Sequence, residues 1–282
     1  MPLTRSLVCG IALVLLAGAA ASALGETISL PRPMPSFNQY YTDGDDAWGD
    51  CSLGETTCPD TLWESGCLVT AFAAVLAYYD VTVSVAASES STGSARTGMD
   101  PGILNDWLHA HGGFDNCHLV WEAVPSHVGL ARHVNRSEVG LNPVASIVID
   151  YALRQGHPII AGVHWGAICR SGSSQSEDCH WVVITGKIGD TYRIMDPINW
   201  DSASPYGVST TLDQGTKGAY IIDRYYVVAP DTGADVPPTI GERPDDAGLD
   251  LGPSPLATLL TLLVAVAAVA AAVLILSGTS AP

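Results

Sequence analysis

The stretch from Trp63 to Tyr79 constrains this chain more than any other part of the sequence. It places Cys67 directly after a glycine and at the start of an almost unbroken apolar run that contains no proline. Such a run predicts a buried helix with Cys67 in its first turn. The free N–H groups and the dipole of a helix start both favour a thiolate there. A small cysteine that only packs into a core is the alternative, and the rest of the chain has to decide between the two.

The composition limits the size of the fold and the partners of the protein. The chain has 282 residues, enough for one or two domains with a hydrophobic core. It carries 29 acidic and 12 basic side chains, which give a formal net charge of −17. An acidic surface repels phosphate backbones, so we expect no nucleic-acid partner. Lysine occurs only at Lys187 and Lys217.

Two apolar segments flank the central part of the chain. Residues 1–25 combine Arg5, a short apolar core and the small residues Ala21-Ser22-Ala23, a pattern typical of a secretory signal peptide. Residues 256–277 are long and apolar enough to form a transmembrane anchor. Residues 231–255 are acidic, rich in proline and free of aromatic side chains, which predicts an extended linker.

These segments predict where the protein resides. We expect a folded domain over residues 30–230 at the cell surface, outside the cytoplasm, anchored by the C-terminal helix after the signal peptide is cleaved. An uncleaved N-terminal anchor is one alternative. A C-terminal segment that is removed during attachment of a lipid anchor is another.

Helical patterns precede strand patterns along the central part. Asp100 and Pro101 predict the N-cap and first residue of a second helix, which Gly112-Gly113 would end. Shorter helices are predicted at 121–124 and 146–155. Strands are predicted at 158–164, 180–186, 191–196, 220–222 and 225–228. Residues 36–41 read as a short strand or extended segment, and residues 80–99 as a flexible excursion. The order indicates an α+β fold with an antiparallel sheet.

Six cysteines lie outside the N-terminal apolar segment, namely Cys51, Cys58, Cys67, Cys117, Cys169 and Cys179. In a secreted protein the simplest pairs are Cys51 with Cys58 and Cys169 with Cys179. These two pairs leave Cys67 and Cys117. A third disulfide between them would remove the free thiol at Cys67, and the spacing does not decide whether it forms.

The loop between Thr42 and Asp60 is rich in acidic residues. Asp43, Asp45, Asp46 and Asp50 offer the clustered carboxylates that calcium prefers. The spacing lacks the complete twelve-residue calcium loop with its terminal glutamate. A solvated acidic loop is therefore the favoured interpretation, and no metal or other cofactor is predicted.

Four residues supply the groups that a thiol hydrolase needs: a nucleophile, a base, a group that orients the base, and donors for the oxyanion. Cys67 is the candidate nucleophile. His180 opens one predicted strand and Asp196 ends the next, and the short turn at 187–190 brings the two side chains toward one rim of a hairpin. Gln39 precedes the nucleophile and offers an amide N–H.

Seven short segments occur in one order along the chain: Gly66-Cys67-Leu68-Val69-Thr70-Ala71, Tyr78-Tyr79, Asp100-Pro101-Gly102-Ile103-Leu104-Asn105-Asp106-Trp107-Leu108, Gly112-Gly113, Gly156-His157-Pro158-Ile159-Ile160, His180-Trp181-Val182-Val183-Ile184-Thr185-Gly186 and Ile194-Met195-Asp196-Pro197. Together they resemble the C39-like family of papain-fold cysteine peptidases over residues 37–228. The resemblance implies a papain-like fold, with a helical half that carries Cys67 and a sheet half that carries His180 and Asp196.

The resemblance also implies a role for each site residue. Cys67 would be the nucleophile, His180 the general base and acid, Asp196 the group that orients His180, and Gln39 part of the oxyanion hole. Many family members have Cys-Gly-Pro-Thr at the nucleophile, whereas Leu68 stands at the second position of that motif in this chain and Val69 at the third.

The function expected from these residues is that of an extracytoplasmic cysteine peptidase acting on a peptide or protein. The best-known family members are fused to transporters and cut leader peptides in the cytoplasm. No nucleotide-binding domain is predicted in this sequence, so that role is not carried over. One alternative is an amidase or acyl-transferase with the same residues. Another is an inactive surface domain in which Cys67 is bonded to Cys117. The sequence predicts no oligomeric state.

Overall fold

The structure is a computed structural model that describes residues 26–230, apart from residues 55–57, 126–127, 136–139 and 166–178. The predicted signal peptide, acidic linker and membrane anchor lie outside the described residues. Within the described ranges, no helix combines the length and the apolar character that a bilayer crossing requires.

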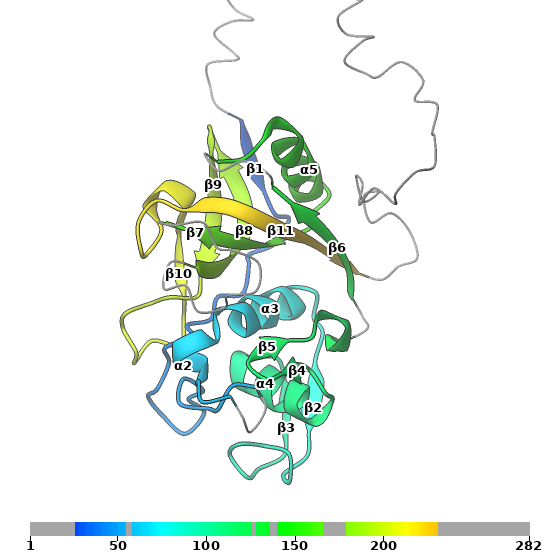
Figure 1. Ribbon diagram of the computed structural model, residues 1–282, viewed down its shortest axis with the longest axis vertical. Helices are drawn as coiled ribbons and strands as arrows, with labels where there is room; N and C mark the ends of the chain where they lie inside the picture. The colour runs from blue at the N-terminus through cyan, green and yellow to red at the C-terminus, as the bar shows by residue number, and fades with distance from the viewer. Residues whose placement is uncertain (1–25, 55–57, 126–127, 136–139, 166–178, 231–282) are drawn as a thin grey trace, which may run out of the picture. The chain divides into compact units, whose positions relative to one another are not determined.

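The described chain is a mixed α/β structure with antiparallel sheets (Figure 1). Its helices are α2 (Leu62–Ser65), α3 (Cys67–Tyr78), α4 (Pro101–Ala110) and α5 (Pro143–Arg154), with the 3-10 turns η1 (Trp121–Ala123) and η2 (Leu212–Gln214). Its strands are β1 (Thr27–Ser29), β2 (Val83–Val85), β3 (Arg96–Gly98), β4 (Phe114–Asp115), β5 (His118–Leu119), β6 (Val128–Val134), β7 (Ile159–His164), β8 (Cys179–Ile188), β9 (Thr191–Asp196), β10 (Val208–Thr211) and β11 (Ile221–Pro230). The predicted combination of helices with an antiparallel sheet is confirmed.

In the described part of the chain, seven strands form one antiparallel sheet. Six follow the order β10-β9-β8-β7-β11-β6, and β1 pairs with the far end of β8. β7 pairs with β8 only as far as Ile184, and β1 pairs with Gly186–Ile188. The two predicted strands 220–222 and 225–228 are one strand, β11, with a register shift between Ile222 and Arg224.

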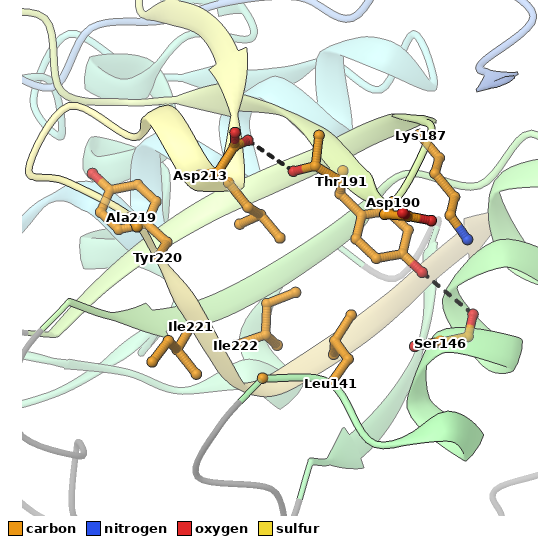
Figure 2. Close-up of a pocket in the computed structure, with 13 residues that line it drawn as sticks. Leu141, Ser146, Lys187, Asp190, Thr191, Asp213, Ala219, Tyr220, Ile221 and Ile222 are labelled. Atoms are coloured by element: carbon orange, nitrogen blue, oxygen red, sulfur yellow. Dashed lines mark hydrogen bonds between the residues drawn. The ribbon is translucent and has the colours of Figure 1, made fainter. Parts of the chain in front are cut away.

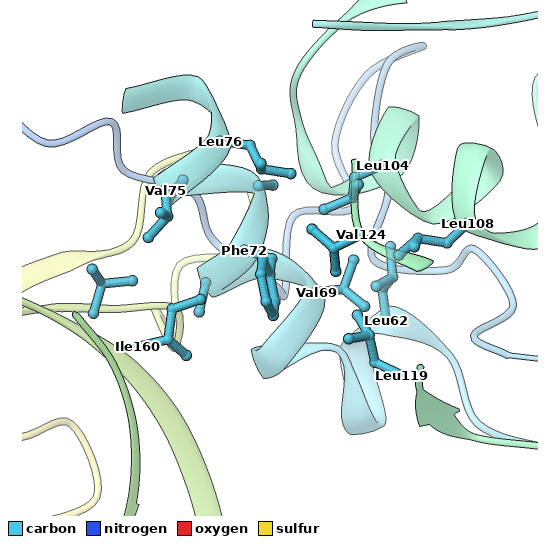
Figure 3. Packing of buried hydrophobic residues seen from close by; sticks show 14 of the residues in the cluster. Leu62, Val69, Phe72, Val75, Leu76, Leu104, Leu108, Leu119, Val124 and Ile160 are labelled. Atoms are coloured by element: carbon cyan, nitrogen blue, oxygen red, sulfur yellow. The ribbon is translucent and has the colours of Figure 1, made fainter. Parts of the chain in front are cut away.

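Helix α3 packs between the sheet and α4 because nearly all of its surface is apolar. It begins at Cys67, as predicted, and every residue from Val69 to Leu76 is buried. A helix that is apolar on all sides has to be covered on all sides. Figure 3 shows Phe72 between Ile160 of the sheet and Leu104 of α4. Burial of such a ring stabilises the fold by roughly 1.5–3 kcal/mol.

The sheet is buried on both faces. Along β7, Ile160 belongs to the core that includes α3, whereas Ile159, Ala161 and Val163 belong to the core that includes α5. The alternation follows from the two-residue period of a strand. The sheet is therefore enclosed between α3 on one face and α5 on the other (Figure 1).

The helix starts follow local sequence signals. Asp100 caps α4 by accepting a hydrogen bond from the Ile103 N–H at 2.7 Å, and Pro101 is the first helical residue, as predicted. Thr61 and Glu64 form a reciprocal capping box at α2. Helix α2 was not predicted, although Thr61 and Glu64 have the spacing of a capping box in the sequence.

Several further segments differ from the predicted strands and loops. Residues 80–99 contain the hairpin β2–β3, because Val83 and Val85 are buried against Ile103 of α4. Residues 36–41 form no strand. Strands β1 and β6 were not expected either, since three residues are too short a pattern to recognise and β6 carries arginine and histidine inside its apolar run.

The predicted pair of Cys51 with Cys58 is wrong. Cys58 is bonded to Cys117, 59 residues further along the chain, and Cys51 is free beside Ser91. The segment after α4 turns back through β4 and β5 and carries Cys117 to Cys58, a contact that spacing along the sequence does not reveal. A disulfide between Cys67 and Cys117 does not form, and Cys67 is free.

The second predicted disulfide lies partly outside the described residues. Cys179 at the start of β8 is disulfide-bonded. Its expected partner, Cys169, lies outside the described residues.

Candidate active site

The structure brings His180 and Asp196 into direct contact, as the hairpin predicted. His180 Nε2 lies 2.7 Å from Asp196 Oδ1, and the two side chains are 3% and 0% exposed. An ionised carboxylate only accepts hydrogen bonds, so Nε2 carries the proton in this contact. The other ring nitrogen, Nδ1, is then free to act as a base.

A one-residue bulge in β8 puts these two side chains on the same face of the sheet. Beside the turn, Ile188 pairs with Thr191, and this register would point His180 and Asp196 to opposite faces. The register shifts by one residue between Ile184 and Gly186, which leaves Thr185 as the extra residue. Beyond the bulge, the side chains of His180 and Asp196 point to the same side.

Four groups hold the carboxylate of Asp196. Oδ1 accepts from His180 and from the Ile198 N–H at 3.0 Å, and Oδ2 accepts from the Thr216 N–H at 3.1 Å and from the Tyr220 hydroxyl at 2.8 Å. Burial alone would raise the pKa of Asp196, but the hydrogen bond and charge of His180, together with the other donors, lower it to about 2. The group is therefore a fixed carboxylate at any physiological pH.

The electrostatics of His180 link it to Cys67. Burial disfavours the charged imidazolium, but the hydrogen bonds and charges of Asp196 and Cys67 outweigh that effect and raise the pKa of His180 to about 9. Asp196 occupies Nε2, so Nδ1 is the nitrogen that remains for Cys67. The structure thus brings the predicted nucleophile to the predicted base from a different element, α3.

Gln39 connects the segment that follows Asp196 with the segment that precedes Cys67. Its backbone N–H donates to the carbonyl of Pro197, directly after Asp196, and its side-chain Nε2 donates to the carbonyl of Trp63, both at 2.9 Å. The neighbouring side chain of Asn38, fully buried, fixes this segment by accepting from the backbone N–H groups of Tyr40 and Asn199. All four predicted site residues are therefore brought to one place.

The junction of α2 and α3 leaves a backbone donor open at the nucleophile. In a continuous helix the Cys67 N–H would bond to the carbonyl of Trp63, four residues earlier. Gln39 takes that carbonyl instead, and within the described chain the Cys67 N–H has no hydrogen-bond acceptor. Only glycine fits at position 66, because a Cβ there would lie 2.4 Å from the Leu62 carbonyl oxygen.

Aromatic rings border the site, and sequence reasoning missed them. Tyr40 stacks on Trp63 with ring centroids 4.4 Å apart and approaches Trp200 at 5.3 Å. Burial raises the pKa of Tyr40, and the electrostatic influence of Cys67 and Asp196 raises it further. No local pattern marks Trp63, Trp200 or Tyr40 as neighbours, since they come from three separate segments.

Tyr220 and Thr216 were also missed as supports of Asp196. They lie 24 and 20 residues after Asp196, in the loop that leads into β11. Tyr220 was placed only in a predicted strand, and Thr216 was assigned no role. Two general rules could have pointed to such supports. A buried tyrosine hydroxyl normally finds a hydrogen-bond partner, and a buried carboxylate needs several donors.

A cavity of about 470 Å³ lies elsewhere, lined by residues from α5, β9, η2 and the start of β11 (Figure 2). Neither Cys67 nor His180 lines it. Tyr220 alone belongs both to its lining and to the groups that contact Asp196. The candidate chemistry is therefore assigned to the convergence of side chains at Cys67 and not to this cavity.

The described residues offer one group of three side chains close enough to share a metal ion, Cys58, Asp60 and Cys117. The two sulfurs are bonded to each other, so they are not thiolate ligands. The carboxylates between Asp43 and Asp50 form no such group in the part of the chain that the structure describes. The set of Cys58, Asp60 and Cys117 therefore does not fit a bound cation.

A free thiol, a buried imidazole, a fixed carboxylate and two N–H donors can together transfer an acyl group. No protein-family model and no curated protein matches this chain, so its assignment to the family of C39-like peptidases stays a prediction from the residues.

Proposed function

We propose that this protein is a cysteine peptidase with a papain-like fold, similar to the C39-like family, that cleaves peptide bonds outside the cytoplasm. The observation that carries the proposal is the arrangement of His180, which is buried between Asp196 and the free thiol of Cys67. This order of carboxylate, imidazole and nucleophile is the one that activates a weak nucleophile.

Acylation begins from the ion pair in which the proton of the Cys67 thiol rests on His180 Nδ1, as the raised pKa of His180 favours, and Cys67 Sγ attacks the carbonyl carbon of the substrate. The carbonyl oxygen becomes an oxyanion, for which the Cys67 N–H and the remaining side-chain N–H of Gln39 are donors. As the tetrahedral intermediate collapses, the C–N bond breaks and the imidazolium returns the proton to the leaving amine. Asp196 keeps the ring oriented and stabilises its positive charge.

Deacylation reverses the roles of the same groups. His180 Nδ1 takes a proton from water, and the hydroxide oxygen attacks the thioester carbonyl. The C–S bond breaks, the acid product leaves, and the proton on the imidazolium restores the resting pair with Cys67. One water is consumed for each peptide bond cleaved.

The extracytoplasmic location is supported by the disulfide between Cys58 and Cys117, because such bonds persist in oxidising compartments. We propose that residues 1–25 are removed as a signal peptide and that residues 256–277 anchor the protein through the linker 231–255. Membrane fractionation of the full chain, with and without residues 256–277, tests the anchor.

The central experiment compares the two free cysteines. At neutral pH, iodoacetamide should modify Cys67 in the non-reduced protein much faster than Cys51, because burial raises the pKa of Cys51. Cys67→Ala should remove hydrolysis of a peptide library, with a loss of roughly 10⁴-fold or more. Cys51→Ala is the matched control and should keep activity. Modification of Cys51 but not of Cys67, or full activity of Cys67→Ala, contradicts the proposal.

Product analysis by mass spectrometry distinguishes the alternatives. A peptidase yields a new carboxylate and a new amine from an internal peptide bond. An acyl-transferase moves the acyl group to an added amine, and an amidase releases ammonia or a non-peptide amine. An inactive domain gives none of these products, even when the labelling experiment shows that Cys67 is free.

A further inference from the structure

Lys217 is a cation that the proposed chemistry does not use. The chain has two lysines, and Lys187 is neutralised by Asp150 at 2.6 Å. Lys217 is exposed and has no carboxylate within ion-pair distance among the described residues. An unpaired cation in a chain with a net charge of −17 is available to an external anion.

Two tryptophan rings hold the Lys217 ammonium in place. Its Nζ lies 4.4 Å from the ring centroid of Trp200 and 5.9 Å from that of Trp165. A cation over the face of an indole ring is attracted by the electrons of the ring and loses freedom to move. The ammonium keeps its three N–H donors, because a ring face uses its charge but satisfies no hydrogen bond.

The backbone of Lys217 is tied to the carboxylate of the site. Its N–H donates to the Tyr220 hydroxyl at 3.2 Å, and that hydroxyl donates to Asp196. The preceding Thr216 N–H also donates to Asp196. The lysine is therefore positioned by the same groups that position His180.

Each of the two tryptophans lies close to a different group of the candidate site. The Trp165 ring lies 6.5 Å from the His180 ring, and the Trp200 ring lies 5.3 Å from the ring of Tyr40, which follows Gln39. Each of these steps is shorter than two extended peptide residues, which span about 7 Å. A peptide bound at Cys67 and His180 therefore reaches Lys217 within a few residues.

We propose that Lys217, held by Trp165 and Trp200, binds a carboxylate of the substrate within about four residues of the scissile bond, so that the enzyme prefers acidic peptides. This proposal rests on the proposed peptidase function. The carboxylate belongs either to an aspartate or glutamate side chain or to the C-terminus of the peptide. General attraction does not explain such a preference, because the acidic protein as a whole repels acidic peptides.

The test uses blocked hexapeptides of one sequence, each with Glu at one position, and matched peptides with Gln there. A further pair differs only in a free or an amidated C-terminus. For the wild type, kcat/KM should be about threefold higher for Glu than for Gln at one position near the cut, or for the free C-terminus over the amidated one, a difference of about 0.6 kcal/mol. Which pair shows the effect identifies the source of the carboxylate.

Substitutions at Lys217 connect the preference to this residue. Lys217→Met should bring the ratio close to one, Lys217→Glu should reverse it, and Lys217→Arg should restore it. Arg193→Met is the matched control, because it removes an equal charge from an exposed position on β9 and should keep the ratio. Raising the salt from 0.05 to 1 M should shrink the wild-type ratio, because an exposed ion pair is screened.

Binding to Cys67→Ala separates this proposal from the proposed function. The Glu hexapeptide should bind that variant about threefold more tightly than the Gln hexapeptide by calorimetry. If the wild type cleaves no peptide but this binding difference is present and is lost with Lys217→Met, the peptidase proposal fails and the carboxylate site stands. If the wild type cleaves peptides without a carboxylate preference, or if Lys217→Met keeps the preference, the carboxylate site is overturned. Equal binding of both peptides also overturns it.

Discussion

The two sides of the candidate site differ in how far their polar groups are satisfied. On the sheet side, both oxygens of Asp196 accept hydrogen bonds, and the pair with His180 is almost completely buried. On the helix side, Cys67 is only partly buried and its N–H has no acceptor in the described chain. The buried Oε1 of Gln39 also lacks a donor among the described residues.

This difference separates what is fixed before a substrate arrives from what is left for the substrate to complete. Saturated buried groups are rigid, because each change of position breaks several bonds in a medium of low dielectric. Open donors at the start of a helix are ready for a negative charge and need no rearrangement. The sheet side therefore orients the base, and the helix side binds the oxyanion that develops during the reaction.

The largest expected effect comes from breaking the sheet side. Asp196→Asn should lower kcat about 10³- to 10⁴-fold, because an amide donates to Nε2, moves the ring proton to Nδ1 and leaves no base for the thiol. Steady-state kinetics on the best library peptide measures it. Asp213→Asn, an exposed carboxylate on η2, is the control and should stay close to the wild type. A loss of less than tenfold in Asp196→Asn would mean that Asp196 does not orient His180.

The next effect comes from the helix side. Gln39→Ala should lower kcat about 100-fold with a smaller change in KM, because it removes a donor that acts on the oxyanion. Alkylation of Cys67 by iodoacetamide should change much less, since attack on a saturated carbon forms no oxyanion. Equal losses in both reactions would show that Gln39 supports the fold of the site and not the oxyanion. Gln214→Ala, an exposed glutamine, is the control.

The pH profile sharpens the comparison through His180. Its raised pKa predicts that kcat/KM persists above the ordinary histidine value of 6.5 and falls as the pH passes about 9, where the imidazolium loses its proton. Asp196→Asn removes a hydrogen bond and a charge that raise this pKa, so its alkaline limb should move down by about 1–3 pH units. If the alkaline limb of Asp196→Asn did not move, the limb would not report the ionisation of His180.

The raised pKa of His180 also predicts how the stability of the fold depends on pH. A group whose pKa is higher in the folded state stabilises the fold fully below its unfolded pKa, near 6.5, and loses that contribution as the pH rises through about 9. Urea unfolding of the wild type and of His180→Gln should therefore differ more at pH 6 than at pH 10. A constant difference between the two proteins would contradict the link between His180 protonation and stability.

The smallest expected effect comes from removing one hydrogen bond to Asp196 without removing a charge. Tyr220→Phe keeps the ring but leaves Asp196 Oδ2 with the Thr216 N–H, and kcat should fall about three- to tenfold. Tyr206→Phe, whose side chain is 65% exposed, controls for loss of a hydroxyl. If Tyr220→Phe equals the control, the carboxylate is held well enough by its other donors.

Features set by neighbouring residues were predictable from the sequence. The apolar run of α3, the Asp100-Pro101 start of α4 and the turn between β8 and β9 are read within a few residues, and the structure has all three. The approach of His180 to Asp196 was predicted from that hairpin and is confirmed, although their shared face depends on the bulge at Thr185, which was not predicted. The roles of Cys67 and Gln39 in catalysis stay predictions, although the structure brings both to the pair.

Features set by contacts between distant segments were not predictable. The bond from Cys58 to Cys117 depends on the path of the chain after α4, and the ring of Trp200 meets Tyr40 across 160 residues of sequence. Residues 80–99 were predicted to be flexible because small polar residues dominate them, yet two buried valines pack a hairpin against α4. Such cases need the three-dimensional arrangement.

Because of the bulge at Thr185, the number of residues in β8 decides whether the imidazole of His180 faces the carboxylate of Asp196. Deleting that single residue would turn the imidazole away from the carboxylate while every catalytic side chain remained in the sequence. Insertions or deletions of two residues would keep the facing but move the imidazole along the strand by about 7 Å. Related chains that keep this pair should therefore conserve the number of residues between its members more strictly than the identity of the residues in between.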